Sequence, residues 1–168
     1  MASHGPGDGD IVEIGSFVGN STIYLAAPNR DRVHAVDPHS PDSMTQVPGS
    51  ADTSATFRAN LERFGVLGRV EYHRMRSTQA AAQWTGPPVR LLFIDGLHTY
   101  EAVVSDYLAW QPHLAERHVV LFDDFLWPEV ERAVRDLRRQ FSPSWFAIRG
   151  GHAVFSTDPL SVRVAGLP

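Results

Sequence analysis

Short apolar runs alternate along the chain with longer segments in which apolar residues recur every three or four positions. Four of the runs end directly in glycine or aspartate: residues 11–14 before Gly15, 33–36 before Asp37, 91–94 before Asp95 and 119–122 before Asp123. A fifth, weaker run covers residues 69–73. Short, nearly continuous apolar runs are typical of strands buried on both faces of a parallel sheet.

Three of the intervening segments have the spacing of an amphipathic helix. Their apolar residues are Phe57, Leu61 and Phe64 in the first, Val103, Tyr107 and Trp110 in the second, and Val130, Ala133, Val134, Leu137 and Phe141 in the third. Gly65 is a natural stop for the first helix and Thr99 a candidate N-cap for the second. Pro128 suits the first turn of the third helix.

Two further apolar runs, residues 145–148 and 153–155, flank Gly150 and Gly151. Two strands separated by a glycine pair predict an antiparallel hairpin. The alternation of strands and helices before this hairpin predicts a doubly wound sheet. We therefore expect an α/β fold, a Rossmann-like and mostly parallel sheet with a C-terminal antiparallel hairpin, formed by residues 1–168 as a single domain.

Composition narrows the chemistry that such a sheet can carry. The 168 residues include neither cysteine nor lysine, which excludes thiol and Schiff-base nucleophiles and zinc sites built from cysteine. The net charge of −4 argues against a nucleic-acid partner. No apolar run approaches the roughly 20 residues of a membrane span, so we expect a cytoplasmic protein without a membrane partner. The arginine-only basic complement suggests a bacterial origin.

The first strand end predicts a ligand-binding turn. Gly15 permits a tight exit from the strand, and Gly19 permits a close backbone approach where the next helix begins. The spacing is not G-x-G-x-x-G, so it does not favour a dinucleotide site, and the glycines could serve the turn alone. Asp37 follows about 20 residues later, where a carboxylate can accept both hydroxyls of a ribose or simply cap the turn before Pro38.

A second group of polar residues follows two later strands. Asp95, Asp123 and Asp124 would share one edge of a parallel sheet, where three carboxylates repel one another unless they are protonated or bridged by a cation. Their oxygen ligands favour Mg²⁺, Ca²⁺ or Mn²⁺. His98 can reach the same pocket, and an imidazole with an ordinary pKa of about 6.5 suits a general base. Taken alone, His98 could also be a loop histidine bonded to the backbone.

Four segments together resemble the class I S-adenosylmethionine-dependent methyltransferases: IVEIGSFVGNSTIYLA, VHAVDP, LLFIDGLHTYEAVVSDYLAW and VVLFDDF. The resemblance covers residues 11–137. It is strongest to the branch of metal-dependent O-methyltransferases, which includes catechol-type enzymes and macrolide- and aminocoumarin-sugar methyltransferases. Cephalosporin hydroxylase-like proteins are similar in the same segments.

The resemblance implies roles at the matching positions. S-adenosylmethionine would be bound by Glu13, Gly15, Ser16, Phe17, Gly19, Asn20 and Ser21 around its methionine part, by Asp37 at its ribose, by Arg76, Ser77 and Thr78 beside its adenine, and by Asp95. A cation, Mg²⁺ or another hard divalent ion, would be held by Asp95, Asp123 and Asp124. His98 and Asp95 would be the catalytic residues. His98 stands where catechol-type enzymes carry a basic lysine.

The chain departs from the family pattern in two places. Relatives carry N-terminal helices that cover the cofactor, and these are largely absent here, so a lid would come from residues 38–51, from a partner subunit, or be missing. Long loops of that kind often serve as lids. Relatives also carry Gly-Gly before the fifth strand, where this chain has Glu116, Arg117 and His118, so we expect a differently built turn.

The implied activity is metal-assisted methyl transfer to a hydroxyl of a small molecule, such as a catechol or a sugar diol. The implied partner is that small-molecule acceptor, and the resemblance leaves a homo-oligomer open. Two other functions remain open at this point. One is a metal-dependent hydroxylase-like enzyme on the same fold, and the other is a non-catalytic, cofactor-binding partner subunit.

Overall fold

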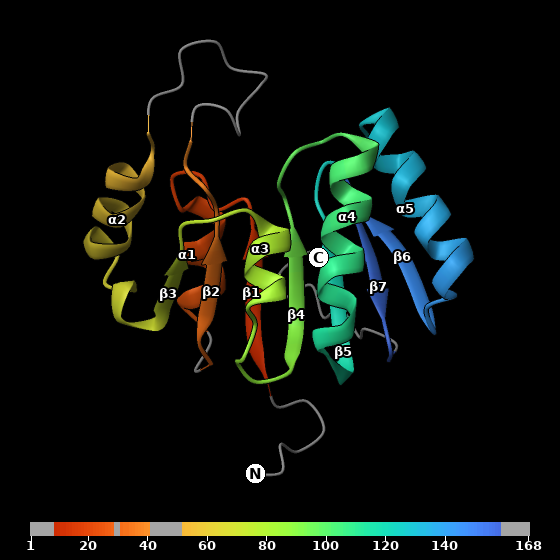
Figure 1. The fold of residues 1–168 in the computed structure, drawn as a ribbon, viewed down its shortest axis with the longest axis horizontal. Helices are drawn as coiled ribbons and strands as arrows, with labels where there is room; N and C mark the ends of the chain where they lie inside the picture. The colour runs from red at the N-terminus through yellow and green to blue at the C-terminus, as the bar shows by residue number, and fades with distance from the viewer. Residues whose placement is uncertain (1–8, 29–30, 41–51, 159–168) are drawn as a thin grey trace, which may run out of the picture.

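The computed structural model describes residues 9–28, 31–40 and 52–158. Within these ranges one sheet has the strand order β3-β2-β1-β4-β5-β7-β6 (Figure 1). The elements follow one another along the chain as β1 Asp10–Ile14, α1 Asn20–Ala26, β2 Val33–Val36, α2 Ser54–Arg63, β3 Val70–His73, α3 Ser77–Ala82, β4 Val89–Ile94, α4 Tyr100–Trp110, β5 Leu114–Phe122, α5 Pro128–Phe141, β6 Trp145–Arg149 and β7 His152–Ser156. Two short 3-10 helices, Leu67–Arg69 and Gln111–His113, precede β3 and β5.

The pairing of the strands confirms the expected fold class. Strands β1 to β5 pair in parallel, with β1 between β2 and β4. Strand β7 runs antiparallel to both β5 and β6. The turn of this terminal hairpin holds Gly150 and Gly151 at φ 56° and 92°, which is left-handed backbone that glycine adopts without strain.

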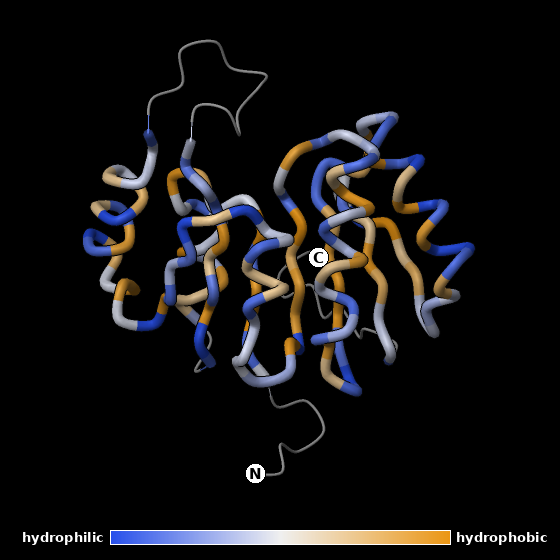
Figure 2. Tube along the Cα trace, in the orientation of Figure 1, coloured by the Kyte–Doolittle hydropathy of each residue, from blue (hydrophilic) through white to orange (hydrophobic). Residues whose placement is uncertain are grey.

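Helices cover the two faces of the sheet as separate layers. In Figure 1, α3, α4 and α5 lie in front of the sheet, where they pack on Val12, Ile14 and Leu92 among others. On the other face, α1 and α2 pack on Ile11 and Val33. Figure 2 shows the central strands as a largely hydrophobic band between these helices. The near-continuous apolar runs are therefore explained by burial on both faces.

Two local expectations from the sequence are wrong. Phe64 does not continue the buried stripe of its helix: it caps the end of α2 and is 59% exposed. Glu116–His118 do not form a turn before the fifth strand, because β5 already begins at Leu114. The register shifts between the pairs Val89↔Leu114 and Leu91↔Val119, so the extra residues are accommodated as an irregularity inside the strand.

The other helix signals are confirmed. The Thr99 hydroxyl accepts a hydrogen bond from the Ala102 amide and caps α4, and Pro128 occupies the first turn of α5. Gly65 follows α2 at φ 68°. Of the predicted lid segment, residues 38–40 are among the described residues and residues 41–51 lie outside them. No helix in the described ranges is long and apolar enough to span a bilayer.

Candidate active site

The predicted strand ends meet at one edge of the sheet. Each continues its neighbour's backbone ladder by one residue: Gly15 donates to the Val36 carbonyl, Asp37 to His73, Asp95 to Ile14 and Asp123 to Ile94, with N···O distances of 2.9–3.1 Å. The edge includes the position between β1 and β4. On one side of it the chain continues from β1 to β2 and β3, and on the other side lie β4 and β5. Open α/β sheets bind ligands at such a switch point.

The turn after β1 depends on its two glycines. Gly15 has φ 88°, and a Cβ there would lie 2.0 Å from the Asp95 carbonyl oxygen. Gly19 also has φ 88°, and a Cβ there would lie 3.0 Å from the Phe57 ring. A side chain at position 15 would therefore push β1 away from the backbone that follows β4. The turn exposes Phe17, which has φ 45° and is 46% exposed.

Two backbone amides hold the side chain of Asp37 in place. Its Oδ2 accepts from the Phe17 amide at 2.8 Å, and its Oδ1 accepts from the His39 amide at 2.6 Å. The hydrogen bond from the His39 amide is the turn-capping role that the sequence left open for Asp37. A carboxylate oxygen can accept more than one hydrogen bond, so both oxygens retain capacity for a ligand.

Glu13 and Ser16 lie fully buried beneath this turn, at 0% and 1% exposure. The Thr22 hydroxyl donates to Oε2 of Glu13. Oε1 of Glu13 and Oγ of Ser16 have no hydrogen-bond partner among the described residues. Burial raises the pKa of Glu13 to about 7, against the hydrogen bonds from Ser21 and Thr22. Buried polar atoms normally find partners, so this pair marks a place where a polar ligand group would be satisfied.

A cavity of about 400 Å³ opens beside these strand ends. The predicted residues that line it are Gly15, Phe17, Asp37, Arg76, Ser77, Thr78, Asp95 and His98. The predicted residues that do not line it are Glu13, Ser16, Gly19, Asn20, Ser21, Asp123 and Asp124. The cavity therefore joins the predicted ribose and adenine positions to the acidic edge.

One polar group of the cavity wall was missed by the sequence analysis. Asp106 in α4 lines the cavity and is 8% exposed. Burial raises its pKa to about 6, and a hydrogen bond with Ser77 opposes the shift. Oγ of Ser77 also accepts from the Trp110 indole at 3.0 Å. Its position could have been found from the sequence, because a charged residue three positions after Val103 lies on the buried stripe of the predicted helix.

At the far side of the cavity, His98 lies between two carboxylates. Its Nε2 is 2.9 Å from Oδ2 of Asp124 and 3.8 Å from Oδ1 of Asp95. The interaction with Asp95 raises the pKa of His98, and the carboxylates of Asp124 and Asp123 add to the shift. Burial raises the pKa of Asp95. One ligand atom from each of Asp95, His98 and Asp124 lies within 4.8 Å of the others.

The structure places Asp123 apart from this group. Its Oδ1 accepts from the Asp124 amide at 2.7 Å and lies 2.7 Å from Nδ1 of His152. Asp124 itself has φ 49°, a conformation that costs a non-glycine residue free energy and is common at functional sites. The turn after β5 therefore directs Asp124 to His98, and Asp123 to the β6–β7 hairpin.

Trp127 is a second residue that the sequence analysis missed. Its ring centroid lies 4.9 Å from that of His98, and the residue is 45% exposed. Its neighbour Leu126 is 75% exposed. Large apolar side chains exposed beside a polar cluster are typical of ligand-contacting surface. Trp127 carries no distinctive spacing in the sequence, so only its position at the start of α5 identifies it.

A family model described as a methyltransferase domain matches residues 12–125. The fold is similar to that of the O-methyltransferase NovP, with a TM-score of 0.73 and 18% identity over 89% of this chain and 72% of that one. It is also similar to the O-methyltransferase TomG of Streptomyces achromogenes, solved with SAM (0.64, 19%, 89% and 73%). A third similar structure is a TDP-rhamnose 3'-O-methyltransferase of calicheamicin biosynthesis (0.61, 20%, 89% and 71%).

Proposed function

Because the chain belongs to a family of methyltransferase domains, we propose that it transfers the methyl group of S-adenosylmethionine to a hydroxyl oxygen of a small molecule. The observation that carries this proposal is the continuity of one cavity from Asp37 to His98. The cavity gives a nucleoside-binding carboxylate and a candidate base a common space. The family match confirms the resemblance to methyltransferases found in the sequence.

The residues of the first turn fit the cofactor. Oε1 of Glu13 and Oγ of Ser16 are buried without partners among the described residues, and Gly15 keeps the turn against the backbone after β4. We assign the methionine part of the cofactor to this turn, including Phe17, Gly19, Asn20 and Ser21. When bound, S-adenosylmethionine supplies a methyl group on a positively charged sulfur, which an oxygen nucleophile displaces in line.

Asp37 and the start of α3 would hold the nucleoside. Asp37 is anchored by two backbone amides, so its carboxylate is already oriented for the two ribose hydroxyls. Arg76, Ser77 and Thr78 line the adjoining wall and would border the adenine. The Ser77 hydroxyl forms hydrogen bonds with Asp106 and with the Trp110 indole, which orient it within this wall.

His98 is the proposed base. Its Nε2 faces the carboxylate of Asp124 at 2.9 Å, and the residue lines the cavity. In its neutral form the imidazole can take the proton of an acceptor hydroxyl, after which the carboxylates of Asp95 and Asp124 stabilise the imidazolium. No covalent intermediate with the protein is required.

The carboxylates of Asp95 and Asp124 fit a hard divalent cation such as Mg²⁺, because one oxygen of each lies within 4.8 Å of the other and of a ring nitrogen of His98. When bound, such a cation lowers the pKa of an acceptor hydroxyl and orients it. Asp123 as a third ligand remains a prediction, and it would require the contact with His152 to break. We propose an acceptor with two neighbouring oxygens, a catechol or a sugar diol, packed against Trp127.

The experiment is a methyl-transfer assay with isotopically labelled S-adenosylmethionine and paired acceptors. Each catechol or sugar diol is matched with an analogue that lacks the second oxygen. We expect labelled product from the diols only, its loss on exhaustive chelation and its return with Mg²⁺. Product from neither class would contradict O-methyl transfer, and unchanged product after chelation would contradict the metal role. A requirement for oxygen and a reductant would identify the hydroxylase-like alternative instead.

A further inference from the structure

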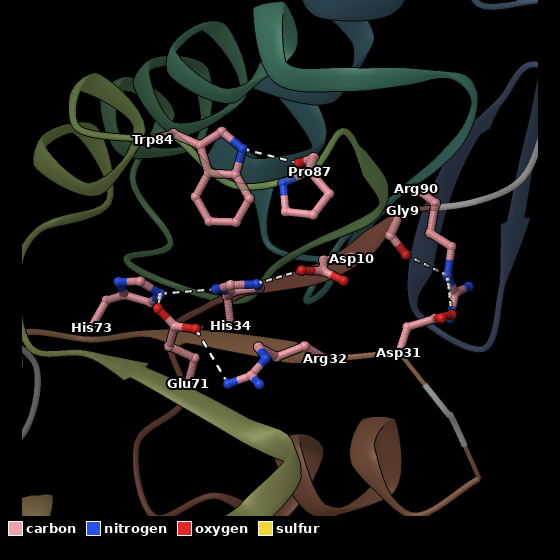
Figure 3. Close-up of polar contacts among 10 residues, drawn as sticks. All are labelled: Gly9, Asp10, Asp31, Arg32, His34, Glu71, His73, Trp84, Pro87 and Arg90. Atoms are coloured by element: carbon pink, nitrogen blue, oxygen red, sulfur yellow. Dashed lines mark hydrogen bonds and ion pairs between the residues drawn. The ribbon is translucent and has the colours of Figure 1, made fainter. Parts of the chain in front are cut away.

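A second polar cluster lies outside the cavity at the strand ends, on β1, β2 and β3 (Figure 3). It consists of Asp10, the first residue of β1, His34, the second of β2, and Glu71 and His73 of β3. The parallel register pairs His34 with Glu71, so both side chains lie on the same face of the sheet. The residues line a second cavity of about 370 Å³, together with Trp84.

The ligand atoms of this cluster are close enough to share one ion. Nδ1 of His34 lies 3.0 Å from Nε2 of His73, which in turn lies 3.9 Å from Oε1 of Glu71. One ligand atom from each of the three residues lies within 4.8 Å of the others. A tetrahedral zinc ion with bonds of about 2.0–2.1 Å separates its ligand atoms by about 3.3 Å. The two imidazole nitrogens would therefore move apart by about 0.3 Å to admit the ion, and the half-exposed Glu71 carboxylate would approach His73 by about 0.6 Å.

The hydrogen bonds around His34 prepare its Nδ1 for this role. Nε2 of His34 lies 2.8 Å from Oδ2 of Asp10, and a carboxylate accepts, so Nε2 carries the proton and Nδ1 keeps its lone pair. A carboxylate behind a histidine is the usual outer support of a metal-bound imidazole. The Trp84 ring packs edge-on against His34 at 4.6 Å, which fixes the ring plane.

The remaining contacts leave one ligand atom of Glu71 for the cluster. Nη1 of Arg32 lies 3.5 Å from Oε2 of Glu71, and Oε1 is the atom that faces His73. In the absence of an ion, His73 donates its Nε2 proton to Nδ1 of His34. When an ion binds, neutral His73 shifts this proton to its own Nδ1 through solvent, so the site loads without net loss of a proton.

We propose that His34, His73 and Glu71 bind a divalent transition-metal ion of the zinc class, with a fourth position open to the second cavity. Two imidazole nitrogens and a carboxylate suit Zn²⁺, Co²⁺ or Ni²⁺, and are a poor set for Mg²⁺ or Ca²⁺. The proposal is independent of the proposed function, because none of these side chains lines the cavity at the strand ends. The competing explanation is a hydrogen-bonded histidine pair that only links β2 to β3.

The test is a calorimetric titration of the full-length chain with ZnCl₂ after chelation and desalting, repeated with CoCl₂ and visible absorption spectroscopy. All proteins carry His98→Ala, because Asp95, His98 and Asp124 are a second candidate group. We expect one Zn²⁺ per chain, weakened at least 100-fold by His73→Ala and 10-fold or more by Glu71→Gln and Asp10→Asn. Bound Co²⁺ should give the intense visible bands of a four-coordinate ion.

His113→Ala is the matched control, since His113 also contacts a tryptophan ring, that of Trp110. It should leave Zn²⁺ affinity unchanged. If His73→Ala fails to fold, Glu71→Gln still tests the site, because Glu71 is half-exposed and its substitution should leave the fold intact. Far-ultraviolet circular dichroism checks the folding of both variants. No Zn²⁺ binding in the His98→Ala background, or equal affinity in Glu71→Gln, would overturn the proposal and leave the histidine pair as a structural contact.

Discussion

Two polar regions occupy the same molecule and are built in opposite ways. At the carboxyl ends of the strands, Asp37 and Asp124 sit in turns, and backbone amides orient them or their neighbours. In the cluster on β1, β2 and β3, His34 and His73 belong to the strands themselves and bond side chain to side chain. The first region surrounds a space between loops, whereas the second is a property of strand register.

The difference has a functional consequence. Turn residues can change conformation with little effect on the sheet, so the first region can accept a large ligand and carry chemistry. Strand residues are fixed by the backbone ladder, so the second region is preorganised for a small, geometrically demanding ligand such as an ion.

The largest effect is expected from removing the proposed base. His98→Ala should lower methyl-transfer turnover by about 10²- to 10³-fold, because proton removal from the acceptor is no longer assisted. The affinity for S-adenosylmethionine should stay close to that of the wild type, and the strand-borne cluster should keep its Zn²⁺ affinity. Steady-state kinetics with His113→Ala as the control measures the change. Turnover near the wild-type level would remove His98 from the mechanism.

Glu13 contrasts with Asp10 because its carboxyl group is fully buried, whereas that of Asp10 is partly exposed and lies beside His34. Because burial raises the pKa of Glu13 from 4.5 to about 7, ionisation is disfavoured in the folded state. Below pH 4.5 the carboxyl is protonated in both states, so burying it carries no ionisation penalty. As the pH rises from 4.5 to 7, the carboxyl ionises in the unfolded state first, and the free energy of unfolding falls. Glu13→Gln avoids this loss. The unfolding free energy of the variant minus that of the wild type should therefore be about 3 kcal/mol larger at pH 8 than at pH 4.5.

Chemical denaturation at the two pH values, without cofactor, measures this difference. Glu62→Gln changes an exposed glutamate of α2 and should show no pH-dependent difference from the wild type. If Glu13→Gln and the wild type differ equally at both pH values, then Glu13 is ionised at no cost. In that case the unpartnered Oε1 of Glu13 would not mark the cofactor's position.

Trp127 tests where the acceptor lies. Trp127→Ala should raise the KM for the acceptor about tenfold, because the aromatic surface beside His98 is lost. The KM for S-adenosylmethionine should not change. Tyr24→Ala removes another exposed aromatic residue, in α1, and should leave both constants unchanged. An equal rise in the two KM values would mean that Trp127 supports the cavity as a whole.

The smallest effect is expected from Asp123. Since its carboxylate contacts His152 rather than His98, Asp123→Asn should weaken activation by Mg²⁺ only a few-fold, whereas Asp124→Asn should abolish most of it. Titration of the chelated enzyme with Mg²⁺ compares the two variants. Equal losses would show that Asp123 leaves His152 and joins Asp95 and Asp124 in the working enzyme.

The sequence predicted the sheet and its carboxyl edge well. The four apolar runs before Gly15, Asp37, Asp95 and Asp123 ended at residues that the structure places at that edge. A parallel sheet brings such strand ends together regardless of how the loops are built. Gly15, Asp37 and Asp95 could therefore be identified as neighbours from the apolar pattern alone. The hairpin at Gly150 and Gly151 followed from turn chemistry.

The rest depended on three-dimensional packing. His34 and His73 occupy unremarkable strand positions, and only the register of β2 and β3 brings their rings together. Asp106 lines the cavity because α4 packs over the front of the sheet (Figure 1). Trp127 contacts the His98 ring because it lies at the start of α5. Asp123 and Asp124 are adjacent in sequence and diverge in the structure, because the left-handed backbone at Asp124 turns the two side chains apart.

The most direct test of the central claim is a calorimetric titration of the full-length chain with S-adenosylmethionine. We predict one molecule bound per chain and an affinity about 100-fold lower in Asp37→Asn, which loses charge-assisted hydrogen bonds to the ribose. Asp136→Asn, which changes a carboxylate of α5 that does not line the cavity, should bind like the wild type. Absence of binding by the folded wild-type chain, or unchanged affinity in Asp37→Asn, would contradict the account.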